Sequence, residues 1–177
     1  MLKYFLRLLS LIAAIVSVLL LFEQLLPRSY DFERSVEIDC LAEEVFPYLN
    51  SPKKWSQWSQ QFNTQWIEGE FKYNATDEGV GAAQTWTEIR GPSKAWITES
   101  KPNEALTYVG GLQSFPKMTN TFSLKPTGEG KTIVRWRSTG RLPRTPLYGL
   151  GAFLFDTQMG YEHEKSLAAL KFLVEQE

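Results

Sequence analysis

The sequence KAWITESKPNEALTYVGGLQSFPKMTNTFSLKPTGEGKTIVRWRST, residues 94–139, contains four short runs rich in β-branched and aromatic residues. Turn-forming residues separate these runs, such as Pro102 and Asn103 after the first of them. Short strands at this even spacing are typical of an antiparallel meander. The predicted strands are residues 94–101, 105–110, 119–125 and 132–139.

The region before this stretch predicts three further strands and two small helices. Residues 32–38 alternate between apolar and polar, as a half-buried strand does. A short helix is predicted at residues 42–49, and a second helical segment carrying Trp55 and Trp58 begins at Pro52. The other two predicted strands are residues 65–73 and 82–89.

The C-terminal segment, residues 146–177, has the pattern of a long helix. A curved antiparallel sheet needs a cover for its apolar face, and such a helix supplies one. We therefore predict an α+β fold with about seven strands curved around this helix, and an apolar cavity between the sheet and the helix. The residues that step by three or four along the inner side of the helix are Phe155, Met159, His163, Leu167, Leu170 and Val174.

The N-terminal segment is long and apolar enough to anchor the chain in a membrane. Residues 8–22 are apolar apart from Ser10 and Ser17. Extended to residues 4–26, the helix is roughly 34 Å long, against a bilayer core of about 30 Å. No small-x-small cleavage pattern follows it, so an uncleaved signal anchor is favoured over a cleaved signal peptide. We predict two parts, an anchor at residues 1–29 and one globular domain at residues 30–177.

Basic residues near the anchor predict its orientation. Lys3, Arg7 and the amino terminus precede the apolar segment, whereas Arg28 and Arg34 follow it. The small excess on the N-terminal side predicts a cytoplasmic N-terminus and a single-pass membrane protein. The domain would then lie in the periplasm if the source is a Gram-negative bacterium.

Composition excludes several classes of protein. The formal net charge is -1, which lacks the basic character of nucleic-acid binders. The chain has one cysteine, Cys40, so no internal disulfide can form. It also has only one histidine, whereas a classical zinc site draws on several Cys and His ligands. We predict no metal and no cofactor. Aromatic residues make up 14% of the chain, which suggests an interior lined with stacked rings.

Five local strings connect the chain to a known superfamily. They are PKKWSQWS (52–59), GVGAAQTW (79–86), WITESKPNEAL (96–106), TFSLKPTGEGKTIVRW (121–136) and MGYEHEKSLAALK (159–171). With the order of the elements, they resemble the bacterial polyketide cyclase/dehydrase-type members of the START-like, or SRPBCC, superfamily, over roughly residues 32–175. The resemblance implies a helix-grip fold. It leaves function open, because the superfamily includes lipid carriers, coenzyme Q-binding proteins, plant hormone receptors, aromatase/cyclases and Hsp90 co-chaperones.

The resemblance also suggests which side chains meet a ligand. If the register of the family holds, the aromatic side chains of the predicted strands face the interior, where they either pack as core or line a cavity. Residues 110–116 form a glycine-containing segment with an apolar tip, which corresponds to a lid over the cavity. The predicted ligand-binding residues are Trp58, Trp86, Trp96, Tyr108, Phe122, Trp136, Met159 and His163.

No catalytic residue is assigned from the sequence. His163 could act as an acid or a base, but no partner for it can be named, and no GxSxG nucleophile motif occurs. Glu88 and Tyr108 are the other candidates if the protein is an enzyme.

Three functions follow as expectations. The first is a membrane-anchored carrier or sensor of a hydrophobic small molecule such as a lipid or isoprenoid, which requires no covalent chemistry. The second is a cyclase, dehydratase or hydrolase that acts on a hydrophobic or aromatic substrate in the same cavity. The third is a module that binds a protein partner at the membrane.

Overall fold

The computed structural model describes residues 2–62, 67–143 and 148–176, and the chain forms seven strands and one long C-terminal helix within them. The predicted order of elements is confirmed. The elements are α1 (Leu2–Leu25), β1 (Ser29–Ile38), α2 (Ala42–Leu49), α3 (Pro52–Trp55), η1 (Gln60–Phe62), β2 (Ile67–Tyr73), β3 (Ala83–Glu88), β4 (Gly91–Lys101), β5 (Ala105–Leu112), β6 (Met118–Pro126), β7 (Thr132–Arg141) and α4 (Tyr148–Val174).

The seven strands form one antiparallel sheet in the order β1-β7-β6-β5-β4-β3-β2. Strands β2 to β7 follow one another as a meander, and β1 pairs with β7 at one edge of the sheet. Strands β1 and β2 are therefore the two edges, and α2 and α3 connect them. The predicted α+β helix-grip architecture is confirmed.

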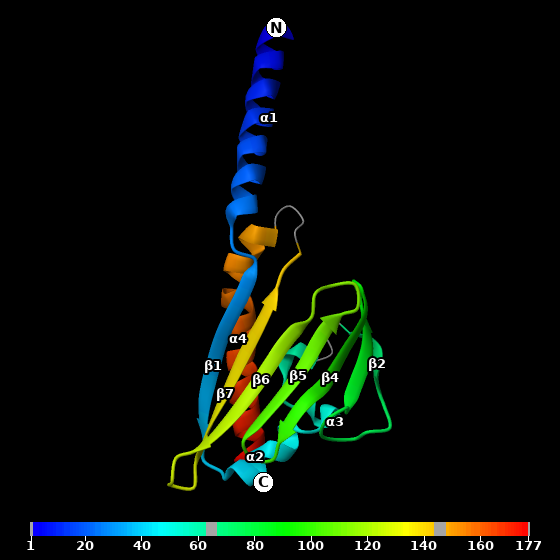
Figure 1. Cartoon of the computed structure of the whole chain (residues 1–177), viewed down its shortest axis with the longest axis vertical. Helices are drawn as coiled ribbons and strands as arrows, with labels where there is room; N and C mark the ends of the chain where they lie inside the picture. The colour runs from blue at the N-terminus through cyan, green and yellow to red at the C-terminus, as the bar shows by residue number, and fades with distance from the viewer. Residues whose placement is uncertain (1, 63–66, 144–147, 177) are drawn as a thin grey trace.

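Helix α4 covers the inner face of the sheet (Figure 1). The alternation along β4 shows which face this is, because Ala95 and Ile97 are buried whereas Lys94 is exposed. The predicted apolar stripe of the helix does face inward, and Leu167, Leu170 and Val174 are buried against the sheet. Helix and sheet thus enclose the interior of the domain.

Several predicted boundaries differ from the structure. The second helical segment ends at Trp55, so Trp58 lies after α3 in a turn. Strand β4 begins at Gly91, three residues before the predicted strand at residues 94–101. Residues 65 and 66 of one predicted strand, and residues 146, 147 and 177 of the predicted C-terminal helix, lie outside the described residues.

Helix α1 extends away from the domain (Figure 1). The side chains of Lys3–Phe22 are exposed, and this stretch is long and apolar enough to cross a membrane. Three residues separate α1 from β1, and Arg28 among them is held by the domain. Its Nη1 donates to the Pro143 carbonyl over 2.6 Å, and its own carbonyl accepts from the Leu142 amide over 2.8 Å.

The domain has an upper end and a lower end. The upper end is the one that α1 joins, where β1 begins, β7 ends and α4 begins (Figure 1). The turn from β5 to β6 lies at this end as well. The lower end carries α2 and the C-terminal end of α4.

Candidate functional site

The lower part of the interior is filled with aromatic side chains. Phe122 and Trp136 are fully buried with their ring centroids 4.8 Å apart, and the Trp58 ring lies 5.9 Å from each. The Trp55 ring lies 4.6 Å from that of Tyr108. We call this region the lower core, and it consists of the buried cluster Ile38, Ala42, Val45, Phe46, Tyr48, Leu49, Trp55, Trp58, Phe62, Ala82, Ala95, Ile97, Leu106, Tyr108, Phe122, Leu124, Val134, Trp136, Leu167, Leu170 and Val174.

A second apolar cluster occupies the upper end. Tyr30 and Phe32 of β1 are buried in it, and the ring of Phe155 from α4 lies 4.6 Å from that of Tyr30. Several of its members are only partly buried, so the cluster is more open than the lower core. We call it the upper cluster, and it consists of Tyr30, Phe32, Leu142, Phe115, Met118, Phe155 and Met159.

A row of polar side chains lies between the two clusters. Tyr108, Asn120 and Ser138 stand opposite one another on β5, β6 and β7, and all three are buried. His163 of α4 is also fully buried, and its ring stacks on Trp136 at 3.7 Å with 12° between the planes. On the other side, the ring of Phe32 lies 5.0 Å away, so His163 contacts both clusters.

Hydrogen bonds join this row into one network. The Tyr108 hydroxyl donates to Gln61 Oε1 over 3.1 Å, and Gln61 Nε2 lies 3.1 Å from His163 Nε2. Because the amide nitrogen can only donate, Nε2 of His163 accepts and the imidazole proton sits on Nδ1. Ser138 and Trp136 both donate to Asn120 Oδ1, over 2.6 Å and 3.0 Å. A polar network is therefore buried inside an otherwise aromatic interior.

Burial keeps the groups of this network uncharged. It lowers the pKa of His163 from 6.5 to about 3, and the positive charge of Arg34 adds to the effect. Burial also raises the pKa of Tyr108 well above its usual value. At neutral pH the imidazole is a neutral, weak base, and the phenol keeps its proton.

The structure brings five of the eight predicted ligand-binding residues together in the interior. Met159 lies above them in the upper cluster, and Trp86 is half-buried beside Phe62, with 5.4 Å between the rings. The five interior residues are Trp58, Tyr108, Phe122, Trp136 and His163. They pack on one another, which corresponds to the core-packing alternative for these side chains.

The predicted inward orientation of Trp96 is wrong. Its neighbours Ala95 and Ile97 face the interior, and successive strand residues point to opposite faces, so Trp96 lies on the outer face. There the Lys94 ammonium lies 5.4 Å from the centre of its ring.

Glu88 lies at the end of β3, where its carboxylate accepts a hydrogen bond from Ser93.

Sequence reasoning missed the amide and hydroxyl groups of the network. Asn120 is two residues from Phe122, and Ser138 is two residues from Trp136. The alternation of strand side chains could therefore have placed both on the inner face. Gln61 precedes β2 and carries no comparable signal. Gln84, which alternates with Trp86 on β3, is also fully buried on the inner face.

The segment predicted as a lid connects β5 to β6 at the upper end. The Phe115 ring lies 5.6 Å from that of Tyr148, the first residue of α4. The Gln113 amide also donates to the Pro92 carbonyl over 2.9 Å. The segment therefore spans from the sheet to the start of the helix, above the upper cluster.

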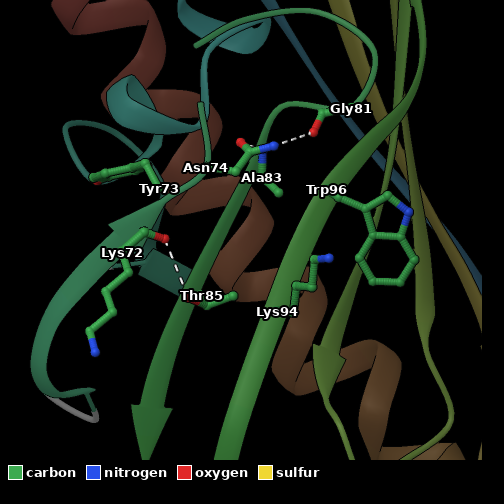
Figure 2. Close-up of a pocket in the computed structure, with 8 residues that line it drawn as sticks. All are labelled: Lys72, Tyr73, Asn74, Gly81, Ala83, Thr85, Lys94 and Trp96. Carbon is green, nitrogen blue, oxygen red and sulfur yellow. Dashed lines mark hydrogen bonds between the residues drawn. The ribbon is translucent and has the colours of Figure 1, made fainter. Parts of the chain in front are cut away.

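Described residues line two of the hollows on the outside of the domain. One, of about 250 Å³, lies on the outer face of β2, β3 and β4 and is lined by Lys72, Lys94 and Trp96, among others. Figure 2 shows Asn74 at its edge, where the side chain donates to the Gly81 carbonyl and accepts from the Ala83 amide. The other, of about 500 Å³, lies beside α4 around Arg34 and Tyr161. Neither hollow lies between the sheet and α4, where the cavity was predicted.

Among the residues that the structure describes, no three His, Cys, Asp or Glu side chains gather as a metal site requires.

The sequence matches the family described as "Polyketide cyclase / dehydrase and lipid transport" over residues 29–175. The chain belongs to this family. The resemblance noted from the sequence is thereby confirmed, and the match covers every strand and α4. Among the curated proteins, none matches the chain.

Solved structures share the fold at low sequence identity. The di-domain ARO/CYC StfQ from the steffimycin biosynthetic pathway is 13% identical, with a TM-score of 0.65 over 84% of this chain and 51% of its own. Norcoclaurine synthase from Thalictrum flavum, solved with dopamine and hydroxybenzaldehyde, is 11% identical, with a TM-score of 0.60 over 88% of this chain and 91% of its own. Protein MLL2253 from Mesorhizobium loti is 21% identical, with a TM-score of 0.56 over 84% of this chain and 98% of its own.

Proposed function

We propose that the protein is a membrane-anchored carrier or sensor of a hydrophobic small molecule, such as a lipid or an isoprenoid. One observation carries the proposal. The apolar interior is only partly covered at the upper end, and the apolar helix α1 joins the domain at that end. A ligand that leaves a bilayer would meet this end of the domain first.

The short connection to α1 supports this arrangement. Three residues reach at most about 10 Å, so the domain must stay close to the surface of any membrane that α1 crosses. Arg28 is bonded to Leu142 and Pro143, which limits rotation of the domain about the connection. The upper cluster would thus be held against the headgroups.

The composition of the upper cluster suits a ligand that enters and leaves. Met118 and Met159 have unbranched, adaptable side chains that repack around different shapes. Phe115 belongs both to this cluster and to the segment between β5 and β6. Movement of that segment away from Tyr148 would open the interior from above.

The charge state of His163 supports binding over catalysis, and the family description allows both. The family description includes lipid transport as well as cyclases and dehydrases. A neutral His163 with a pKa of about 3 is a poor general base at neutral pH, and its hydrogen-bonding neighbours Gln61 and Ser138 are uncharged. We therefore favour a carrier over the enzyme.

The same proposal includes a topology. Lys3 and Arg7 in the first two turns of α1 support a cytoplasmic N-terminus with the domain in the periplasm. Protease added to intact spheroplasts should digest the domain, whereas protection until lysis would reverse the assignment.

Native mass spectrometry of the full-length chain tests the carrier proposal. The chain is purified from bacterial membranes in mild detergent, and bound lipids are identified after extraction. We expect one retained hydrophobic molecule per chain. We also expect Met118→Trp to lose it, because the larger ring fills the upper cluster.

The matched control is Ile89→Trp, because Ile89 is 75% exposed in the turn between β3 and β4. This variant should retain the ligand as the natural chain does. A mass without ligand, unchanged after incubation with vesicles of bacterial lipid extract, would contradict the carrier proposal.

A further inference from the structure

We infer that the ligand enters with its polar end first and that this end is an uncharged carbonyl, which receives hydrogen bonds from the side-chain amide of Asn120. The inference rests on the proposed carrier function and names the chemistry of its ligand. It comes from an excess of buried donors at the boundary between the upper cluster and the lower core.

The orientation of the Asn120 amide is settled by its neighbours. The Trp136 indole N–H can only donate, so the atom 3.0 Å from it must be the amide oxygen. Ser138 donates to the same oxygen over 2.6 Å. The oxygen of Asn120 is therefore fully used inside the protein, and its nitrogen points elsewhere.

That nitrogen is a buried donor without an acceptor. Asn120 is fully buried, and its Nδ2 has no hydrogen-bond partner among the described residues. The same holds for Nδ1 of His163. Buried polar groups in folded proteins are almost always paired, and an unpaired one reduces stability. Within this row both unpaired nitrogen atoms are donors, which suits a guest that brings an oxygen. Gln84, whose buried side-chain oxygen and nitrogen are both unpaired, lies on β3 outside the row.

The charge state of the row indicates the kind of oxygen. Its side chains are all neutral amides, hydroxyls or rings, and burial keeps His163 neutral as well. The nearby cation, Arg34, already forms ion pairs with Asp156 and Glu164 over 3.1 Å and 2.7 Å. A carboxylate or phosphate would be buried without a counter-ion, which is strongly unfavourable, whereas a ketone or ester carbonyl carries no such penalty.

The position of Asn120 indicates the direction of the ligand. Its neighbours on the inner face of β6 are Met118 of the upper cluster and Phe122 of the lower core. The lower core is closely packed, whereas the upper cluster is partly open. The carbonyl would therefore lie deepest, with the hydrocarbon tail between Met118 and Met159 and pointing toward α1.

Three probes with alkyl chains of one length test the inference on the full-length chain in detergent. They are an n-alkane, a methyl ketone labelled with carbon-13 at its carbonyl, and a fatty acid anion. We expect the ketone to bind about fivefold to tenfold tighter than the alkane, and the anion to bind more weakly than the ketone. The labelled carbonyl stretch should move to lower frequency on binding, as a hydrogen-bonded carbonyl does.

Asn120→Leu removes the donors at similar volume and should abolish the preference for the ketone. The matched control is Thr132→Val on β7. It removes a fully buried hydroxyl that donates to the Cys40 carbonyl over 2.8 Å. It should keep the preference, even though it also loses a buried hydrogen bond. The infrared measurement on the natural chain decides the matter if the Asn120 variant does not fold.

Equal binding of ketone and alkane, with an unshifted carbonyl stretch, would overturn the inference. It would leave the carrier proposal intact and assign the spare donors to buried water. Failure of all three probes to bind would contradict both proposals together.

Discussion

The lower core and the upper cluster belong to one sheet and one helix, yet they differ in burial. Phe122 and Leu167 in the lower core are at most 1% exposed. Met118 and Met159 in the upper cluster are only partly buried, and their elements, β6 and α4, both begin at the upper end. The difference teaches that closely packed rings stabilise the fold at one end, while the apolar side chains at the end beside α1 are less completely covered.

Two phenylalanines measure this difference most directly. Phe122→Ala should lower the free energy of unfolding by about 3–5 kcal/mol, because its ring is fully buried between Trp136 and Trp58. Phe155→Ala removes the same atoms from the partly open cluster and should lower it by only about 1–2 kcal/mol. Urea unfolding of the full chain in detergent, followed by circular dichroism, gives both values. Equal losses would show that the two regions are packed alike.

His163, where the two regions meet, should make stability depend on pH. Its pKa is about 3 in the folded chain and about 6.5 when unfolded, so the unfolded chain binds the extra proton between these values. Above pH 6.5, His163 therefore does not lower the free energy of unfolding. Below pH 6.5, the free energy of unfolding falls by about 1.4 kcal/mol per pH unit, or about 2 kcal/mol by pH 5.

His163→Phe should flatten this dependence between pH 6.5 and 5, where most carboxylates stay ionised. His163 is the only histidine of the chain, so the difference between the two urea titrations belongs to it. An unchanged slope in the variant would mean that the imidazole is hydrated in the folded protein.

The smallest effect is expected on the outer face. Trp96→Ala should lower the free energy of unfolding by about 1 kcal/mol or less, because the ring is partly exposed and loses mainly its contact with Lys94. Ligand retention in native mass spectrometry should not change. A loss as large as that of Phe122→Ala, or a lost ligand, would place Trp96 in the interior.

Much of the fold was predictable from local patterns. The helix at residues 42–49 was predicted with its exact bounds, and the strand at 119–125 lies within Met118–Pro126. These predictions succeed because alternation and helical spacing are set by neighbours in the chain. The start of the second helix was also predicted, because proline is favoured at the first position of a helix.

The site was predictable only in part, since it depends on contacts between distant segments. Trp96 was assigned inward from the register of the resembled family, but Ala95 and Ile97 on either side of it take the inner face. The partner of His163 could not be named, because Gln61 lies 102 residues away and belongs to another element. Alternation defines two faces of a strand without stating which one packs against the helix.

The sequence by itself determined that the chain has an apolar N-terminal helix, seven strands in meander order and a long C-terminal helix with one inward stripe. These features follow from residue periodicity and turn chemistry, which act over a few residues. Only the tertiary structure decided that aromatic rings fill the lower interior and that a neutral polar network lies beneath a partly open cluster. The physical reason is that strand register and helix docking bring together side chains whose positions no local pattern specifies.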